Sequence, residues 1–294
     1  MLQQLAVPPQ SAMAPVGAGH LAEVLQDITY RRVLMVNVVF CGVPGAGDRG
    51  WVLVDTGLSG SAGPIRRAAA ARFGEGARPA AIILTHGHFD HVGAVERLAA
   101  DWDAPVYAHP LEHPYLDGRA RYPSGDGTVG GGLMAVLAPL YPRGPINLGD
   151  RLRLLPADGS VPGMPGWRWI HTPGHSVGHI SLWREADATL IAGDAVITTA
   201  QESLSSILLQ YPELHGPPKY YTIDWQAAAS STAALARLRP LTMVTGHGPS
   251  LSGAHLADVL DRLAQEFAEI AVPRRGRYRS MPAVVDDGSA YRPL

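Results

Sequence analysis

The chain has 294 residues, of which 46% are hydrophobic and 17% charged, a globular composition that excludes a disordered chain. With 24 basic and 26 acidic side chains the net charge is -2, so no basic excess indicates a nucleic-acid partner. The one cysteine, Cys41, excludes a disulfide within the chain and a cysteine-rich zinc site. Any metal chemistry therefore depends on the 12 histidines.

The N-terminal residues 1–25 are rich in proline, alanine and glutamine, and we expect them to form a loose arm. Residues 1–20 do not combine a basic start with an apolar signal-peptide core, and no apolar run approaches the ~20 residues of a membrane helix. These features predict a cytoplasmic protein without a membrane partner. The apolar arm and a long final helix suggest the hypothesis of a homodimer.

After the arm, β-branched and apolar runs alternate with alanine-rich and amphipathic stretches. Strands are expected at 33–43, 51–55, 80–84, 105–108, 151–155, 167–171, 179–183, 189–191 and 241–244. Helices are expected at 64–73, 92–100, 227–238 and 255–271. Strands run together before helices twice over, which predicts a layered α/β sandwich with helices outside two β layers.

The domain organisation follows from two irregular stretches. Residues 26–272 are expected to form one catalytic domain, with insertions near 112–148 and 202–223 where regular periodicity is lost. The basic, proline-containing residues 273–294 are expected to form a C-terminal tail.

The most informative segment is His86-Gly-His88-Phe-Asp90-His91, which holds three histidines within six residues. It follows the apolar run 80–84, so it emerges at the end of a buried strand, where loops carry chemistry. His86 and His88 are two residues apart and project to one side in extended geometry. Asp90 and His91 follow as the chain turns into a helix and can face a second point. Two ligand sets from one segment predict a dinuclear metal site.

Three other strand ends present a metal-ligand type of side chain after a glycine. They are His175, Asp194 and His247, which follow Gly174, Gly193 and Gly246. A glycine at this place lets the backbone turn sharply and approach a metal closely. Asp55 also ends a strand, with its glycine two residues later. Each of these strand ends alone is weak evidence for a metal site, but together with the histidine segment they favour one.

The ordered set of Asp55, His86-x-His88-x-Asp90-His91, His175, Asp194 and His247 resembles the five motifs of the metallo-β-lactamase superfamily, over roughly residues 33–250. The resemblance implies a four-layered αββα sandwich made of two similar halves. It also implies the ligands: His86, His88 and His175 for the first metal, Asp90, His91 and His247 for the second, and Asp194 for both. Asp55 would hold the cluster by hydrogen bonding, usually without binding metal.

Aspartate at position 194 distinguishes this chain within the superfamily. The antibiotic-degrading members of subclass B1 have cysteine there, so the chain is more similar to the glyoxalase II, lactonase and general hydrolase branches. His179, four residues after His175, has no ligand role in this pattern, and we expect it to be structural or to orient a ligand.

The function predicted is that of a metal-dependent hydrolase with two divalent ions, zinc first and iron or manganese as alternatives. A metal-bridging hydroxide would cleave an ester, lactone or thioester, with Asp90 and Asp55 as the catalytic carboxylates. Hydrolysis of β-lactams or phosphodiesters on the same site is an alternative. The basic C-terminal residues do not form a clear glutathione-binding pattern, which makes glyoxalase II activity a weaker alternative. An iron-dependent oxidoreductase similar to sulfur dioxygenases is the alternative of a different class.

The substrate is expected to be a small molecule, and the irregular stretches give the only hints about it. The residues proposed to contact it are Tyr220, Tyr221 and His215. The other aromatic or apolar candidates are Tyr115, Tyr122, Met134, Tyr141 and Tyr211. These side chains either line a pocket beside the metals or pack the insertions onto the core, and the sequence leaves both open.

Overall fold

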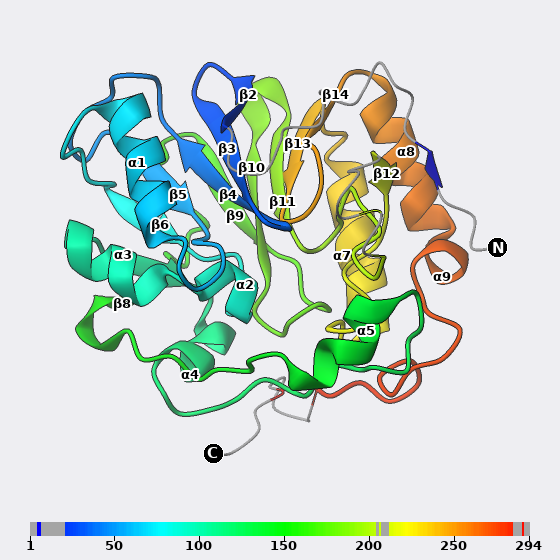
Figure 1. Cartoon of the computed structure of the whole chain (residues 1–294). Coiled ribbons are helices and arrows are strands. Elements are labelled where there is room, and N and C mark those ends of the chain that lie inside the picture. The colour runs from blue at the N-terminus through cyan, green and yellow to red at the C-terminus, as the bar shows by residue number, and fades with distance from the viewer. Residues whose placement is uncertain (1–4, 7–20, 204–205, 207–211, 285–289, 291–294) are drawn as a thin grey trace. The chain divides into compact units, whose positions relative to one another are not determined.

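A computed structural model describes residues 5–6, 21–203, 206, 212–284 and 290, which form two compact units (Figure 1). The N-terminal unit comprises residues 21–122 and 143–169. The C-terminal unit comprises residues 5–6, 123–142, 170–203, 206, 212–284 and 290. Most of the predicted arm 1–25 and the end of the predicted tail 273–294 lie outside the described residues, and the predicted domain boundaries stay predictions.

The N-terminal unit is built on a seven-stranded sheet in the order β2-β3-β4-β5-β6-β7-β8. Its strands are β2 Leu21–Leu25, β3 Ile28–Val33, β4 Val36–Cys41, β5 Val52–Val54, β6 Ala81–Ile83, β7 Val106–Ala108 and β8 Leu152–Leu154. Neighbours from β2 to β5 pair antiparallel, and neighbours from β5 to β8 pair parallel. The carboxyl ends of β5, β6 and β7 therefore share one edge of the sheet, where the loops that follow them meet.

Helices pack on this sheet through an aromatic and aliphatic core. The helices are α1 Ala62–Phe73, α2 Phe89–Val92, α3 Val95–Trp102, η1 Pro110–Glu112, α4 His113–Leu116 and η3 Gly149–Arg151. Phe73 of α1 stacks on Trp51 with ring centroids 4.4 Å apart, and both belong to the core that holds Leu98 of α3. Burying each such side chain contributes about 1.5–3 kcal/mol, which keeps the sheet edge and its loops in place.

The C-terminal unit is built on a five-stranded sheet in the order β14-β13-β11-β10-β9. Its strands are β9 Trp167–His171, β10 Ile180–Arg184, β11 Thr189–Gly193, β13 Thr242–Thr245 and β14 Leu251–Ser252, and β1 Leu5–Ala6 pairs separately with β12 Glu213–Leu214. Its helices are α5 Leu133–Leu137, η2 Ala138–Leu140, η4 Glu185–Asp187, α7 Trp225–Arg237, α8 His255–Gln265 and α9 Phe267–Ile270. Strands β11 and β13 are parallel neighbours, so their carboxyl ends also lie side by side.

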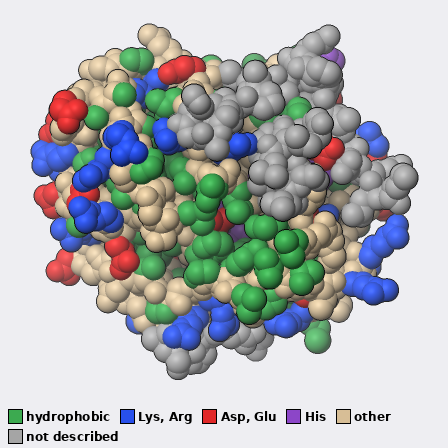
Figure 2. All heavy atoms as spheres, viewed as in Figure 1, with side chains coloured by type: hydrophobic (Ala, Val, Ile, Leu, Met, Phe, Trp, Pro, Cys, Tyr) green, Lys and Arg blue, Asp and Glu red, His purple; other side chains and the backbone are tan. Residues whose placement is uncertain are grey.

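The helical segment of α5 and η2, within the insertion expected near 112–148, packs in an unusual way. Ala135 and Ala138 are buried, whereas Leu133, Val136 and Leu140 are 56%, 63% and 81% exposed. Figure 2 shows hydrophobic side chains gathered on the surface over α5. The segment is therefore held by its small residues and presents its large ones outward.

Candidate metal centre

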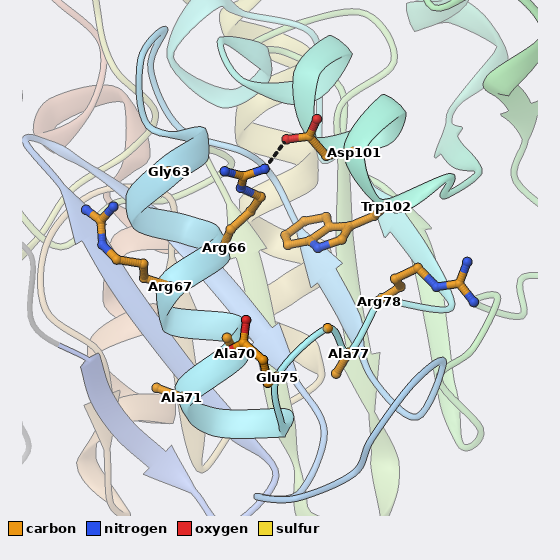
Figure 3. A pocket seen from close by; sticks show the side chains of 11 residues that line it. Gly63, Arg66, Arg67, Ala70, Ala71, Glu75, Ala77, Arg78, Asp101 and Trp102 are labelled. Atoms are coloured by element: carbon orange, nitrogen blue, oxygen red, sulfur yellow. Dashed lines mark hydrogen bonds and ion pairs between the residues drawn. The ribbon is translucent and has the colours of Figure 1, made fainter.

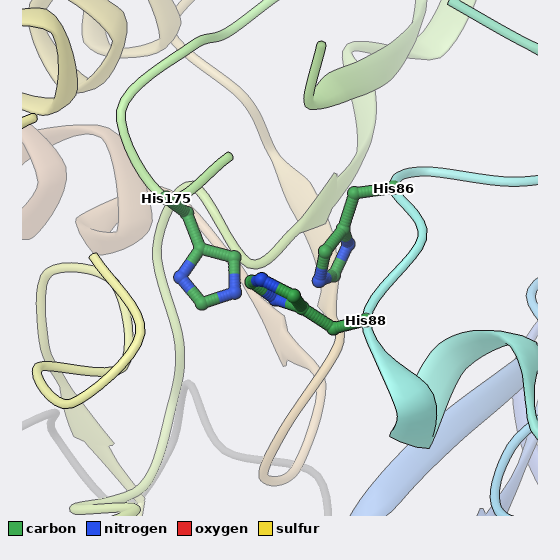
Figure 4. Close-up of side chains that lie close together, drawn as sticks. All are labelled: His86, His88 and His175. Carbon is green, nitrogen blue, oxygen red and sulfur yellow. The ribbon is translucent and has the colours of Figure 1, made fainter. Parts of the chain in front are cut away.

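The loop that leaves β6 brings together the four side chains of the histidine segment. His86, His88, Asp90 and His91 are at most 6% exposed. The imidazole rings of His86 and His88 lie 4.6 Å apart and nearly perpendicular (Figure 4), and those of His86 and His91 lie 4.2 Å apart. One donor atom of His86 lies within 4.8 Å of one of His88, and the same holds for His86 with His91 and for Asp90 with His91. The strand expected to end before this segment is β6, and the helix expected to follow begins at Phe89.

Asp55, at the end of β5, holds this loop from the neighbouring strand. It is 3% exposed and its carboxylate accepts three hydrogen bonds: from Thr85 N–H at 2.8 Å, from the Thr85 hydroxyl at 2.7 Å and from His91 Nδ1 at 2.8 Å. Its backbone lies in the left-handed region at φ 60°, a strained conformation that persists where surrounding contacts enforce it.

These hydrogen bonds assign the tautomers of two histidines. Because Asp55 accepts the Nδ1 proton of His91, the lone pair of neutral His91 is on Nε2. The Thr85 hydroxyl gives its hydrogen to Asp55, so at 3.0 Å its oxygen accepts the Nδ1 proton of His86. Both rings therefore present Nε2 as the nitrogen that can bind a metal. No sequence motif predicted Thr85, although its position directly before the first histidine was a usable signal.

In the C-terminal unit, His175, Asp194 and His247 form a second cluster, and each is at most 2% exposed. The Asp194 carboxylate oxygen Oδ2 lies 3.4 Å from His175 Nε2 and 3.1 Å from His247 Nε2. Asp194 and His247 come together because β11 and β13 are parallel and end side by side, with Gly246 N–H donating to Gly193 O at 2.8 Å. Before His175 the chain needs glycine, since a Cβ on Gly174 would lie 2.4 Å from the backbone nitrogen of Ala228.

His179 is fully buried and orients Asp194. Its Nε2 accepts the backbone N–H of Asp194 at 2.8 Å, so its Nδ1 carries the proton and donates to the Thr172 hydroxyl at 2.8 Å. Thr172 in turn lies 3.1 Å from the hydroxyl of Ser181, which donates to Ala192 O at 2.9 Å. This chain of hydrogen bonds runs in one direction and fixes the neutral tautomer. Of the two roles expected for His179, the geometry favours the one that orients a ligand residue.

The residues predicted to contact substrate fall into two groups. Tyr220 and Tyr221 are 3% and 5% exposed, and both rings pack near Tyr141, at 6.2 and 6.3 Å between centroids. Thr222, which no sequence motif predicted, follows them, and its hydroxyl oxygen lies 3.5 Å from His175 Nδ1. His215 instead pairs with Glu213 at 3.2 Å. Tyr211 lies outside the described residues.

A surface hollow of about 790 Å³ lies on the N-terminal unit beside α1, and it holds none of the predicted site residues (Figure 3). Arg66, Arg78 and Trp102 are among its lining residues, and Arg66 forms an ion pair with Asp101 at 2.6 Å. Arg78 also has an acidic partner, Asp48. The lining of the hollow holds no histidine and none of the grouped His and Asp residues that could bind a metal, so the hollow is separate from the candidate metal residues.

The two clusters have the donor chemistry of a divalent-metal site. Imidazole nitrogen and carboxylate oxygen suit zinc, iron and manganese, and the assigned tautomers leave nitrogen lone pairs for a metal. Asp90 and Asp194 are 6% and 1% exposed, and a carboxylate buried among imidazoles is costly unless positive charge compensates it. A divalent cation supplies that charge, so the residues fit the metals that the sequence pattern implies. Among the described residues, no helix is long and apolar enough to cross a membrane.

Comparisons with known proteins agree with this chemistry. The chain is 44% identical over 262 residues to the probable metallo-hydrolase YflN of Bacillus subtilis, covering 89% of this chain and 99% of the relative. It is 28% identical over 256 residues to a hydroxyacylglutathione hydrolase of Acidiphilium cryptum, covering 85% and 86%. The crystal structure of TTHA1623 in a di-iron-bound form is similar with a TM-score of 0.51 and 26% identity, over 78% of this chain and 93% of that one.

The predicted αββα fold class and the predicted metal-dependent hydrolase are confirmed by these similarities and by the two sheets with their helices. The family model described as the metallo-beta-lactamase superfamily matches residues 31–247, which include Asp55 and both ligand clusters. With that match, and with 44% identity to a relative covered over 99% of its length, the chain belongs to the metallo-β-lactamase superfamily.

Proposed function

We propose that this metallo-hydrolase holds two divalent metal ions and hydrolyses a carboxylic ester, a lactone or a thioester. The observation that carries the proposal is the position of Asp194. One of its carboxylate oxygens lies 3.4 Å from His175 Nε2 and 3.1 Å from His247 Nε2, and the family pattern assigns these two histidines to different metals. A carboxylate placed between ligands of two ions is suited to bridge them.

The proposed ligand sets join the two clusters. The residues proposed for the first metal are His86, His88 and His175, those for the second are Asp90, His91 and His247, and Asp194 serves both. Within the N-terminal unit, Nε2 of His86 and His91 is the nitrogen proposed to bind metal, because Thr85 and Asp55 engage Nδ1. When bound, the metals supply Lewis acidity and a nucleophilic hydroxide at neutral pH.

The protein side chains have separate tasks in this scheme. Asp55 holds the His91 ring and, through Thr85, the His86 ring, so that both keep one orientation. Asp90 is the carboxylate proposed to orient the nucleophilic water and to accept its proton for delivery to the leaving group. Oδ2 of Asp90 lies 3.9 Å from His91 Nε2. Because Asp90 is only 6% exposed, bulk water is kept away from the proton that it would carry. No serine or cysteine nucleophile is needed.

The proposed substrate class is supported by the aspartate at position 194 and by the relatives. Aspartate at this position is similar to the hydrolase and lactonase branches of the family. The relative from Acidiphilium cryptum is named a hydroxyacylglutathione hydrolase, which favours a thioester among the candidates. The aromatic group made by partly buried Tyr141 and buried Tyr220 and Tyr221 is proposed to face the acyl part of a small-molecule substrate.

An iron-dependent oxidoreductase is the second candidate, and it is favoured by one observation, the di-iron-bound form of the similar protein TTHA1623. The donor set accommodates iron as well as zinc. Protein purified without added metal distinguishes the two: the hydrolase proposal expects turnover without oxygen uptake. Oxygen consumption with a thiol substrate in an iron-loaded sample would favour the oxidoreductase.

The experiment that tests the proposal is a substrate panel of lactones, thioesters, aryl esters, β-lactams and phosphodiesters with metal-replete protein. We expect the highest kcat/KM for a carboxylic ester, lactone or thioester, and a loss of at least about 100-fold in His88→Ala. The matched control is His255→Ala, which removes an exposed histidine at the start of α8 and should leave activity unchanged. Preferred cleavage of a β-lactam or a phosphodiester would overturn the substrate class, and equal activity in His88→Ala would overturn the metal site.

A further inference from the structure

A buried carboxylate lies behind the histidine segment and has no place in the metal pattern. Glu112 ends η1, the short helix that follows β7, and it is fully buried. Strand β7 is the parallel neighbour of β6, so the loops that follow the two strands leave the same edge of the sheet. A carboxylate is rarely buried to this degree unless hydrogen bonds satisfy it. Its partners therefore indicate what it does.

Glu112 binds the backbone between two proposed ligands. Its Oε2 accepts the N–H of Gly87 at 3.0 Å and the hydroxyl of Tyr122. The Gly87 N–H also points to the Tyr122 oxygen, at 2.9 Å. Gly87 stands between His86 and His88, so the carboxylate and the phenol hold the peptide that connects the two imidazoles. Breaking either hydrogen bond inside the protein would leave a buried polar atom unsatisfied, which makes this contact a firm one.

Tyr122 adds a contact to a ligand ring. Its ring lies 4.5 Å from the His88 ring and stacks on Tyr115 at 3.7 Å with an interplanar angle of 15°. Both tyrosines are at most 2% exposed. The aromatic wall restricts the rotation of His88, and the stacked pair keeps the wall itself in place. The sequence left open whether these tyrosines line a pocket or pack, and the contacts described here are packing contacts.

The same contacts explain the glycine at position 87. A Cβ on Gly87 would lie 2.5 Å from the Tyr122 oxygen, closer than real Cβ contacts. The phenol therefore occupies the space that any other residue at position 87 would need. Glycine is required here by the close approach of Tyr122 to the backbone.

We infer that Glu112 and Tyr122 are positioning residues, which preset the peptide at Gly87 and thereby the two imidazoles of His86 and His88 for metal binding. Neither residue touches the reacting atoms. The inference rests on the proposed function, because it takes His86 and His88 as metal ligands. It goes beyond that function by assigning the binding geometry to a carboxylate from a different loop. A role in fold stability alone would predict a lower melting temperature with unchanged metal affinity.

The test compares Glu112→Met, which removes the acceptor at similar volume, with Glu112→Gln, which keeps an acceptor oxygen. Zinc affinity is measured by competition with a chromophoric chelator, and the melting temperature of each metal-free protein is recorded beside it. We expect zinc affinity to fall by about 10–100-fold in Glu112→Met and by only about threefold in Glu112→Gln. Glu75→Met, at an exposed turn, is the matched control and should bind zinc as the original chain does.

A second variant covers the case in which Glu112→Met does not fold. Tyr122→Phe keeps the ring and its stacking but removes the hydroxyl that meets Gly87 and Glu112. In the cobalt-substituted protein, its visible absorption spectrum should differ from that of the original chain, while the spectrum of Glu75→Met should not. Unchanged zinc affinity in Glu112→Met, or an unchanged cobalt spectrum in Tyr122→Phe, would overturn the inference. If the original chain binds no zinc, or His88→Ala binds it equally well, the proposed function itself fails.

Discussion

Replacing Asp55 by asparagine tests how the ligand loop is held. Asp55 accepts hydrogen bonds from Thr85 N–H, the Thr85 hydroxyl and His91 Nδ1, and all three lie within 2.8 Å. Asparagine has one acceptor oxygen and one NH2 group. Whichever way the amide lies, the NH2 group faces a donor from Thr85 or from both residues.

The size of the effect follows from these contacts. A hydrogen bond to a charged group contributes about 1.5–3 kcal/mol, and a buried donor left without an acceptor costs about 1–3 kcal/mol. With the NH2 group in place of Oδ2, His91 must move its proton to Nε2, the nitrogen proposed to bind metal; with the NH2 group in place of Oδ1, the Thr85 N–H loses its acceptor and the ligand loop loses that contact. We therefore expect Asp55→Asn to weaken metal binding about 10–100-fold, which corresponds to about 1.4–2.7 kcal/mol.

The assay is a titration of the metal-free protein with zinc in the presence of a competing chelator, which resolves the two binding steps. Asp55→Asn should weaken chiefly the step that involves His91, and Thr85→Val chiefly the step that involves His86, because Val cannot accept the His86 proton. Asp158→Asn, at an exposed turn, is the matched control. Binding of both metals to Asp55→Asn with the affinity of the original chain would refute this account of the loop.

Three further changes have defined outcomes. His179→Leu leaves the Asp194 N–H without its acceptor and should lower the free energy of unfolding by about 1–3 kcal/mol, measured by urea denaturation, with weaker metal binding. Gly174→Ala should destabilise more than Gly76→Ala, because both have positive φ but only Gly174 has a neighbour in the way; equal losses would contradict the steric reason. Burial lowers the pKa of His113, so the unfolded chain binds the proton more tightly and stability should fall as pH drops below about 6.5. His113→Gln should flatten the dependence of melting temperature on pH over that range. An unchanged slope would contradict a contribution of His113 to this pH dependence.

The place of the proposed ligand residues at strand ends was predictable because it depends on local pattern. Four of these residues come directly after a short apolar strand or within a few residues of its end: Asp55, His86, Asp194 and His247. That relation is visible in the sequence. Parallel strands end at the same edge, so residues far apart in the chain come together once the strands pair. The helix predicted at 64–73 is likewise present as α1.

Features that depend on distant contacts were not predictable. The single helix expected at 92–100 is divided into α2 and α3 at Gly93, whose N–H donates to Gly57 O at 2.8 Å and whose Cβ position is filled by the backbone of Ser59. The strand expected at 33–43 is part of a hairpin of β3 and β4 that turns at Leu34, with φ at 55°. No local sequence pattern marks Glu112, since its proposed role depends on the loop that follows another strand, β6.

The central claim is a centre of two metals bridged by Asp194, and counting the metals per chain tests it most directly. We predict close to two zinc ions per chain in protein purified without added metal and analysed by elemental mass spectrometry. We predict one or fewer in Asp194→Asn, because the bridging carboxylate is proposed to serve both ions. One iron per chain with oxygen uptake, or two zinc ions retained by Asp194→Asn, would contradict the account.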